Sequence, residues 1–107
     1  MSIDVREYND REGRSPFAAW FDELNSQAAA KVATALTRLA AGNFSNVRGV
    51  GSGVFEVRID FGPGYRVYFG KDGERVVILL GGGAKKRQQR DIENALSHWE
   101  DYKRRKA

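Results

Sequence analysis

The chain has 107 residues, a net charge of +4, one histidine and no cysteine. This length suits one domain, residues 1–107, whose core needs no metal or disulfide, and the lack of cysteine excludes disulfides and thiolate chemistry. A single histidine argues against a histidine-rich metal site. The surplus of Lys and Arg favours an acidic partner such as nucleic acid, although so small a surplus also occurs in proteins that bind none. The lack of a signal-peptide pattern and of a membrane-spanning apolar run predicts a cytoplasmic protein without a membrane partner.

The N-terminal half predicts one strand and two helices. Residues Ile3 to Tyr8 alternate weakly between apolar and polar side chains, which predicts a first strand. After a loop, Ser15 is a candidate N-cap and Pro16 suits the first helical position. The apolar residues that follow are spaced for the buried stripe of a short helix: Phe17, Trp20, Phe21 and Leu24. A second helix is expected from a Ser26 cap to Gly42, and the short link between the helices predicts a helical hairpin.

Three further strands are expected in an antiparallel meander. Residues Val54 to Ile59 and Tyr65 to Phe69 alternate in polarity, and the sequence Gly62-Pro63-Gly64 between them predicts a tight turn. The third strand, Val76 to Leu80, is apolar on both faces, which predicts a central position in the sheet. In the expected register the first two strands share one polar surface, made of Glu56, Arg58, Arg66 and Tyr68. Two neighbouring arginines without a full complement of carboxylates predict an anion site.

More cations flank the meander. Arg48 lies in the glycine- and serine-rich segment 43–53, which predicts a loop, and both a solvated and a functional side chain stay open for it. Glycines 81–83 are expected to end the last strand, and the next helix then begins with Lys85, Lys86, Arg87 and Arg90. Cations oppose the macrodipole at a helix N-terminus, so this choice hints at phosphate binding. The basic tail, Lys103 to Lys106, suits a helix C-terminus or adds a contact to a phosphate backbone.

The predicted order of elements is β-α-α-β-β-β-α. It indicates an α+β domain, in which a small twisted antiparallel β-sheet carries an N-terminal helical hairpin and a C-terminal helix on one face or edge. The C-terminal helix is expected to bury a stripe of Ile92, Ala95, Leu96 and Trp99.

Several motifs resemble one known family. The segment GPGYRVYF, residues 62–69, and the later pattern of Leu79-Leu80-Gly81-Gly82 with Lys85, Gln88 and Asp91-Ile92 are similar to addiction-module killer proteins, which are HigB-like toxins of the RelE/ParE superfamily. The FxxWxxxL of residues 17–24 and the RLxxGN of residues 38–43 match the same family. The resemblance implies a RelE-like fold and a toxin that a cognate antitoxin neutralises, often a helix-turn-helix protein. It also implies a ribosome-dependent mRNA endoribonuclease that acts on mRNA in the ribosomal A site, beside ribosomal RNA, without a metal or cofactor.

The resemblance also implies roles for individual residues. Arg66 corresponds to the arginine beside the scissile phosphate, Arg58 and Glu56 to groups that line the cleft, and Lys85 to the last catalytic cation. Attack of a ribose 2′-OH on the adjacent phosphate needs a base, stabilisation of charge and an acid. Guanidinium groups suit charge stabilisation. Glu56 is either the base or a structural partner that orients Arg58, and Lys85 either stabilises charge or acts as the acid. Tyr68 either stacks on a base or is buried in the sheet. RNA contacts are predicted for Arg48, Tyr68, Lys86, Arg87, Gln88 and Arg90.

Two other functions stay open. ParE-like members share the fold and inhibit DNA gyrase without catalysis. A degenerate toxin would bind its antitoxin but be inactive, and this alternative arises because Ala84 stands where the subgroup usually has Asp beside the lysine. The catalytic histidine or C-terminal tyrosine of some relatives has no clear equivalent in this chain.

Overall fold

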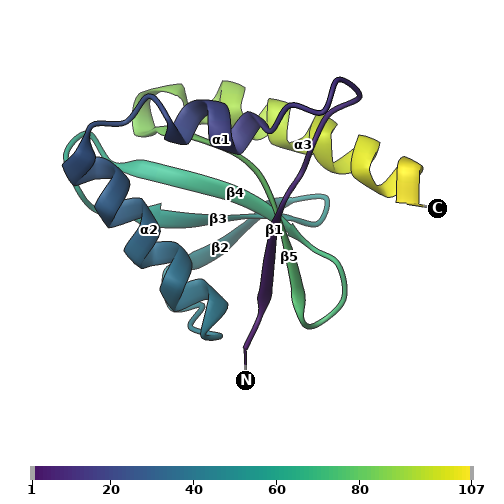
Figure 1. The fold of residues 1–107 in the computed structure, drawn as a ribbon, viewed down its shortest axis with the longest axis horizontal. Coiled ribbons are helices and arrows are strands. Elements are labelled where there is room, and N and C mark those ends of the chain that lie inside the picture. Colours follow the sequence, from purple (N-terminus) through teal and green to yellow (C-terminus); the bar gives the residue numbers. More distant parts are fainter. Residues whose placement is uncertain (1, 107) are drawn as a thin grey trace.

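The computed structural model describes residues 2–106 as a five-stranded sheet with helices on both faces (Figure 1). The elements in chain order are β1 (Asp4–Glu7), α1 (Pro16–Phe21), α2 (Ser26–Ala40), β2 (Val47–Gly51), β3 (Val54–Ile59), β4 (Tyr65–Lys71), β5 (Val76–Ala84), the short 3-10 helix η1 (Lys85–Arg87) and α3 (Gln88–Lys106). No helix in this described part is long and apolar enough to cross a membrane. The α+β class and the predicted elements are confirmed, and one strand is added before the meander.

The strands lie in the order β1-β5-β4-β3-β2. The meander β3-β4-β5 is antiparallel, with β5 central as predicted, but β1 pairs in parallel with β5. The sheet is therefore mixed, whereas the sequence pattern predicted an antiparallel one. No local turn joins β1 to β5, so nothing in the neighbouring residues sets their relative direction. The strand β5 also continues past the predicted stop at the glycines, because a register shift between Tyr68 and Phe69 lets it pair with β4 as far as Ala84.

The added strand β2 corrects the predicted loop over residues 43–53. It pairs antiparallel with β3 and places Arg48 opposite Glu56, and its register shifts between Gly49 and Gly51. This edge strand has glycines between its few apolar residues, so the alternation of polarity that marks a half-buried strand is weak. The edge position matters for function, because it brings Arg48 into the sheet beside the meander.

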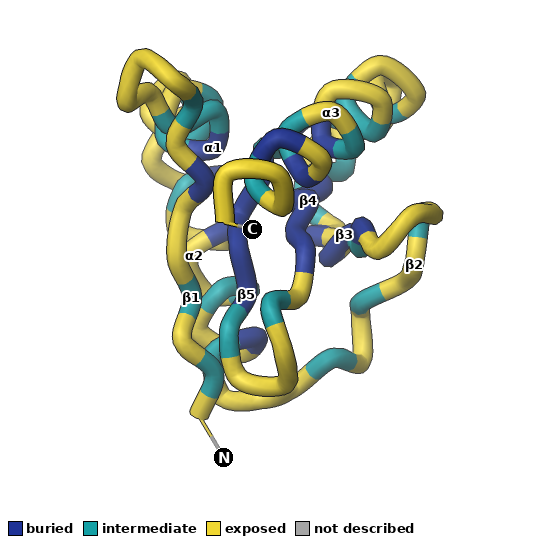
Figure 2. Tube along the Cα trace, turned by 90° about the vertical axis from the view of Figure 1, so that its right-hand side faces the viewer, coloured by how far each residue is buried: buried dark blue, intermediate teal, exposed yellow. Residues whose placement is uncertain are grey.

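The helices cover both faces of the sheet, rather than the single face or edge that was expected. Helices α1 and α2 lie on one face and α3 on the other, with the strands between them (Figure 2). Along β4, Val67 and Phe69 pack toward α1 and α2, while Tyr68 packs toward α3. In β5, successive residues alternate between the two cores in the same way. The predicted stripe of α3 is confirmed, since Ala95 and Trp99 are buried and Ile92 and Leu96 pack beside them.

Capping residues fix where the first two helices begin, and one close contact fixes how α1 lies on the sheet. The Ser15 hydroxyl accepts a hydrogen bond from the Ala18 amide at 3.0 Å, as predicted for α1. The cap of α2 is Asn25, one residue before the predicted Ser26, because its Oδ1 accepts from an amide of the first turn at 2.9 Å. On α1 the Trp20 ring lies so close to Gly82 of β5 that a β-carbon there would come within 2.3 Å of it.

Candidate anion-binding site

A hollow opens where β2 begins, β3 ends, β4 begins and β5 passes into η1. Its volume is about 490 Å³. We call it the basic hollow, and its polar lining residues are Ser45, Asn46, Arg48, Arg58, Asp60, Tyr65, Arg66 and Lys85. Four of these eight side chains are cationic, and they come from four different segments of the chain.

The two predicted strand arginines are direct neighbours. Arg58 on β3 lies opposite Arg66 on β4, which confirms the expected register of the hairpin. Like charges directly opposite each other in a sheet repel, so this pair needs a compensating anion. Lys85 reaches the same place because its amide donates to the carbonyl of Gly64 at 2.7 Å, which ties η1 to the turn between β3 and β4.

Arg66 is the least ordinary of the four cations. The residue is only 5% exposed, yet it lines the hollow. Its Nε is fully enclosed and has no hydrogen-bond partner, although the Oε2 atom of Glu56 lies 3.7 Å away. A largely buried guanidinium whose enclosed Nε has no hydrogen-bond partner, at the wall of a cavity, is suited to bind a phosphate or another oxyanion.

Glu56 is enclosed behind these arginines. It is fully buried, and its Oε2 accepts from Arg48 Nε at 3.1 Å. Its Oε1 accepts from Gln88 Nε2 at 3.0 Å, which connects the sheet to the first turn of α3. Of the two roles predicted for Glu56, the geometry favours the structural one, but with Arg48 and Arg66 as partners instead of Arg58. Its oxygens are occupied and have no access to a substrate proton.

Two predicted RNA contacts are also enclosed. Tyr68 is fully buried between the sheet and α3, so its ring has no free face for a base, and burial together with the nearby Glu56 carboxylate raises its pKa. Its hydroxyl has no hydrogen-bond partner in the described chain. Gln88 is half-buried and its amide is taken by Glu56. Helix α3 covers the sheet face that carries Tyr68, which gives the buried outcome of its two predictions. Gln88, in the first turn of α3, faces Glu56 instead of a ligand.

The remaining predicted contacts lie outside the basic hollow. Three exposed cations follow Lys85 on η1 and α3, namely Lys86, Arg87 and Arg90, and they do not line it. Near them, burial raises the pKa of Asp91, whose Oδ2 is enclosed without a partner in the described residues. The close approach of Asp91 is possible because residue 83 is glycine, where a β-carbon would come within 1.9 Å of Oδ2.

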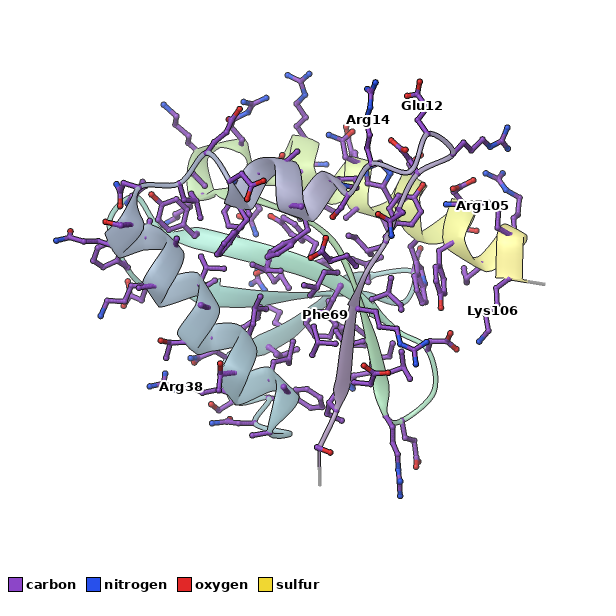
Figure 3. The ribbon with its side chains drawn as sticks, in the orientation of Figure 1. Glu12, Arg14, Arg38, Phe69, Arg105 and Lys106 are labelled. Carbon is purple, nitrogen blue, oxygen red and sulfur yellow. The ribbon has the colours of Figure 1, made fainter. Side chains whose placement is uncertain are left out.

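The cations of the C-terminal tail are paired, which distinguishes them from those of the hollow. Arg105 contacts Asp101 at 2.8 Å, and Lys103 contacts Glu100 at 3.2 Å. Lys106 forms an ion pair with Asp72. Arg105 and Lys106 are labelled at the C-terminal end of α3 in Figure 3. These ion pairs support the first of the two roles predicted for the tail, which is to stabilise the C-terminus of a helix.

Four polar lining residues of the hollow were missed in the sequence: Ser45, Asn46, Asp60 and Tyr65. They lie at or just beyond the ends of strands, where period-two alternation no longer assigns a face. Asp60 is exposed and is the one carboxylate that lines the hollow directly. The available signal for Asp60 was the run of polar and turn residues after the predicted strand Val54 to Ile59, but turns carry such residues for conformational reasons as well.

The residues described here contain no group of three or more His, Asp or Glu side chains arranged to hold a metal ion. The site is thus a cluster of guanidinium and ammonium donors with one free carboxylate and one phenol at its rim.

Fold and site together define a small α+β protein with a hollow lined by four cationic side chains at one end of a mixed sheet. Residues 19–100 match the family described as "Phage derived protein Gp49-like (DUF891)", and the chain belongs to this family. A protein of Haemophilus influenzae (strain ATCC 51907 / DSM 11121 / KW20 / Rd), described as uncharacterized, is 45% identical over 80 residues, which cover 74% of this chain and 81% of that protein. The matched region contains every residue of the basic hollow.

Proposed function

We propose that this Gp49-like protein is a HigB-like toxin of the RelE/ParE superfamily and cleaves mRNA in the ribosomal A site. Its partners would be the ribosome and a cognate antitoxin, of the helix-turn-helix kind common beside such toxins. The observation that carries the proposal is Arg66, a nearly buried guanidinium whose Nε has no hydrogen-bond partner and lies 3.7 Å from Glu56, grouped with Arg58, Arg48 and Lys85 around one cavity. A single phosphodiester group offers the planar oxygen pair that guanidinium donors bind best.

The proposed reaction is attack of a ribose 2′-OH on the adjacent phosphorus. The O2′–P bond forms, the P–O5′ bond breaks, and the products are a 2′,3′-cyclic phosphate and a 5′-hydroxyl. One proton leaves O2′ for a base, and one is supplied to O5′ by an acid. Arg66 and Arg58 stabilise the extra negative charge on the phosphorane, and they are preorganised for it because the hairpin register already places them side by side.

The geometry changes which residue is proposed as the base. Glu56 is enclosed by Arg48 and Gln88, so it acts as a positioning residue that keeps the arginines in place. Asp60 is the carboxylate that lines the hollow and is exposed, and we assign the base role to it. Lys85, which also lines the hollow, is the candidate acid or final charge stabiliser. With an exposed carboxylate as base, the ribosome must supply much of the orientation of the substrate.

The test is to incubate the protein with ribosomes programmed with a defined mRNA and to map the new 5′ ends. Removal of a donor that stabilises transition-state charge typically costs about 10²–10³ in rate, so we expect that loss for Arg66→Ala. Asp60→Asn should cost about 10²–10⁴ if Asp60 moves the proton. Arg75→Ala, which removes an exposed cation outside the hollow, is the matched control and should cleave like the wild type. Cleavage at the wild-type rate in Arg66→Ala would refute the proposal.

A second candidate function rests on the enclosure of Glu56. If Asp60 does not act as the base, the hollow has cations that stabilise charge but no group that accepts the proton. The protein is then a ParE-like inhibitor of gyrase or an inactive toxin that only binds its antitoxin. DNA-damage signalling on expression without new mRNA ends would support the gyrase inhibitor. Expression without any growth defect would support the inactive toxin.

A further inference from the structure

A second hollow lies directly beside the basic hollow, between α2 and the end of β3. Its volume is about 350 Å³, and we call it the α2 hollow. The two hollows share Ser45, Asn46, Arg58, Ile59 and Asp60, so they form one groove with Arg58 at the boundary. Nothing in the sequence pattern pointed to it, because its cations lie on the polar side of α2, where charged residues are usual.

The α2 hollow has its own unpaired cations. Lys31 and Arg38 of α2 line it together with Arg58. Among residues 2–106 none of these three forms an ion pair with a carboxylate, in contrast to the cations of the C-terminal tail. Lys31 Nζ lies over the ring of Phe61, 5.5 Å from its centroid, which holds the ammonium group at the wall of the hollow. The groove therefore carries positive charge well beyond the space that one phosphate fills.

The lining of the α2 hollow is also suited to a base. Its apolar part consists of Ala35, Val57, Ile59 and Phe61, and Thr34, Asn43, Ser45 and Asn46 supply hydroxyl and amide groups. Unstacked nucleobases are held by apolar or planar surfaces and read by hydrogen bonds along their edges. An acidic peptide would use the cations but not this combination of an apolar wall and two amides. The volume is in the range of small-ligand pockets and exceeds the need of a lone inorganic anion.

We infer that the α2 hollow binds the nucleotide that flanks the scissile phosphodiester of a single-stranded RNA. Lys31 and Arg38 contact phosphates of the strand, and the base lies against the apolar wall beside Asn43 and Asn46. The inference rests on the proposed function, because the basic hollow must hold an RNA phosphate for a flanking nucleotide to reach the α2 hollow. It extends that function from one phosphate to a strand with a defined course over β3 and α2.

The test compares the binding of RNA of two lengths to the purified full chain. The probes are a fluorescent dinucleotide and a hexanucleotide, both 2′-O-methylated so that they cannot be cleaved. The double variant Lys31→Gln/Arg38→Gln should bind the dinucleotide like the wild type and lose about tenfold or more in affinity for the hexanucleotide at low salt. Each lost phosphate contact on a single strand reduces the slope of log K against log salt by about 0.7, so the slope should fall by about 1.4.

The matched control is Arg14→Gln/Arg75→Gln, which removes two exposed cations outside both hollows. Figure 3 shows Arg14 far from Arg38. An equal loss in this control, an unchanged hexanucleotide affinity in the α2 variant, or no hexanucleotide binding by the wild type would overturn the inference. Binding of polyglutamate with the same dependence on Lys31 and Arg38, in place of RNA, would overturn it as well.

The proposed function fails separately, if Arg66→Gln binds the dinucleotide as well as the wild type does. The two results are distinguishable, because the α2 hollow is judged by the difference between the two lengths. The basic hollow is judged by the dinucleotide alone.

Discussion

Replacement of Glu56 by Gln tests whether the buried carboxylate holds the site together. Glu56 is fully buried and the Arg66 side chain is 6% exposed, so Glu56→Gln leaves the largely buried charge on Arg66 without its carboxylate partner. Removal of one partner from a buried pair costs about 3–5 kcal/mol. The Arg48 side chain is 57% exposed and adds little, because water solvates it once the pair is lost. We therefore expect a loss of about 3–5 kcal/mol in the free energy of unfolding, a large part of the about 5–15 kcal/mol typical of a domain.

The assay is equilibrium unfolding in urea at neutral pH, where a shifted midpoint with an unchanged m-value reports stability alone. In the double variant Glu56→Gln/Arg66→Gln the unpaired charge is gone, and part of the lost stability should return, with a coupling of about 0.5–3 kcal/mol. Glu100→Gln is the matched control, because it removes a carboxylate from an exposed ion pair with Lys103. The control should change stability by less than about 1 kcal/mol. A loss in Glu56→Gln as small as in the control would refute the reasoning.

Three further outcomes are expected. Gly82→Ala should destabilise the fold by about 1–3 kcal/mol, because its β-carbon would meet the Trp20 ring at 2.3 Å. Gly49→Ala is the control, because its β-carbon would make only ordinary contacts. Equal urea midpoints for the two variants would contradict this prediction. Burial lowers the pKa of His98, the single histidine of the chain, so its neutral form contributes stability above about pH 6.5 that is lost as the pH falls through that range. An NMR titration of its ring proton with a midpoint at or above about 6.5 would show the opposite. Burial raises the pKa of Asp91, so its charged form costs stability as the pH rises through the carboxyl range. Asp91→Asn should gain stability relative to the wild type between pH 3 and 7, and a constant difference would argue against this.

The sequence by itself determined the parts of this protein that depend on neighbouring residues. Alternation in Val54 to Ile59 and Tyr65 to Phe69, with the Gly-Pro-Gly turn between them, was enough for the hairpin and its register. The pairing of Arg58 with Arg66 follows from that register, so the centre of the basic hollow was predictable. Capping residues located the starts of α1 and α2, and apolar stripes located the helices to within about one turn, because both signals are carried by side chains one helical turn apart.

Only the tertiary structure decided which polar residues remain open to a ligand. Period-two alternation divides a strand into two faces, but it does not say which helix covers the second face. Helix α3 covers that face. It encloses Glu56, which the pattern placed on a shared polar surface, and Tyr68, for which burial was one of the two predicted outcomes. The parallel pairing of β1 with β5, and the lining of one hollow by both Asp60 and Lys85, join residues far apart in the chain. Such contacts depend on how complete elements pack, and no local periodicity encodes them.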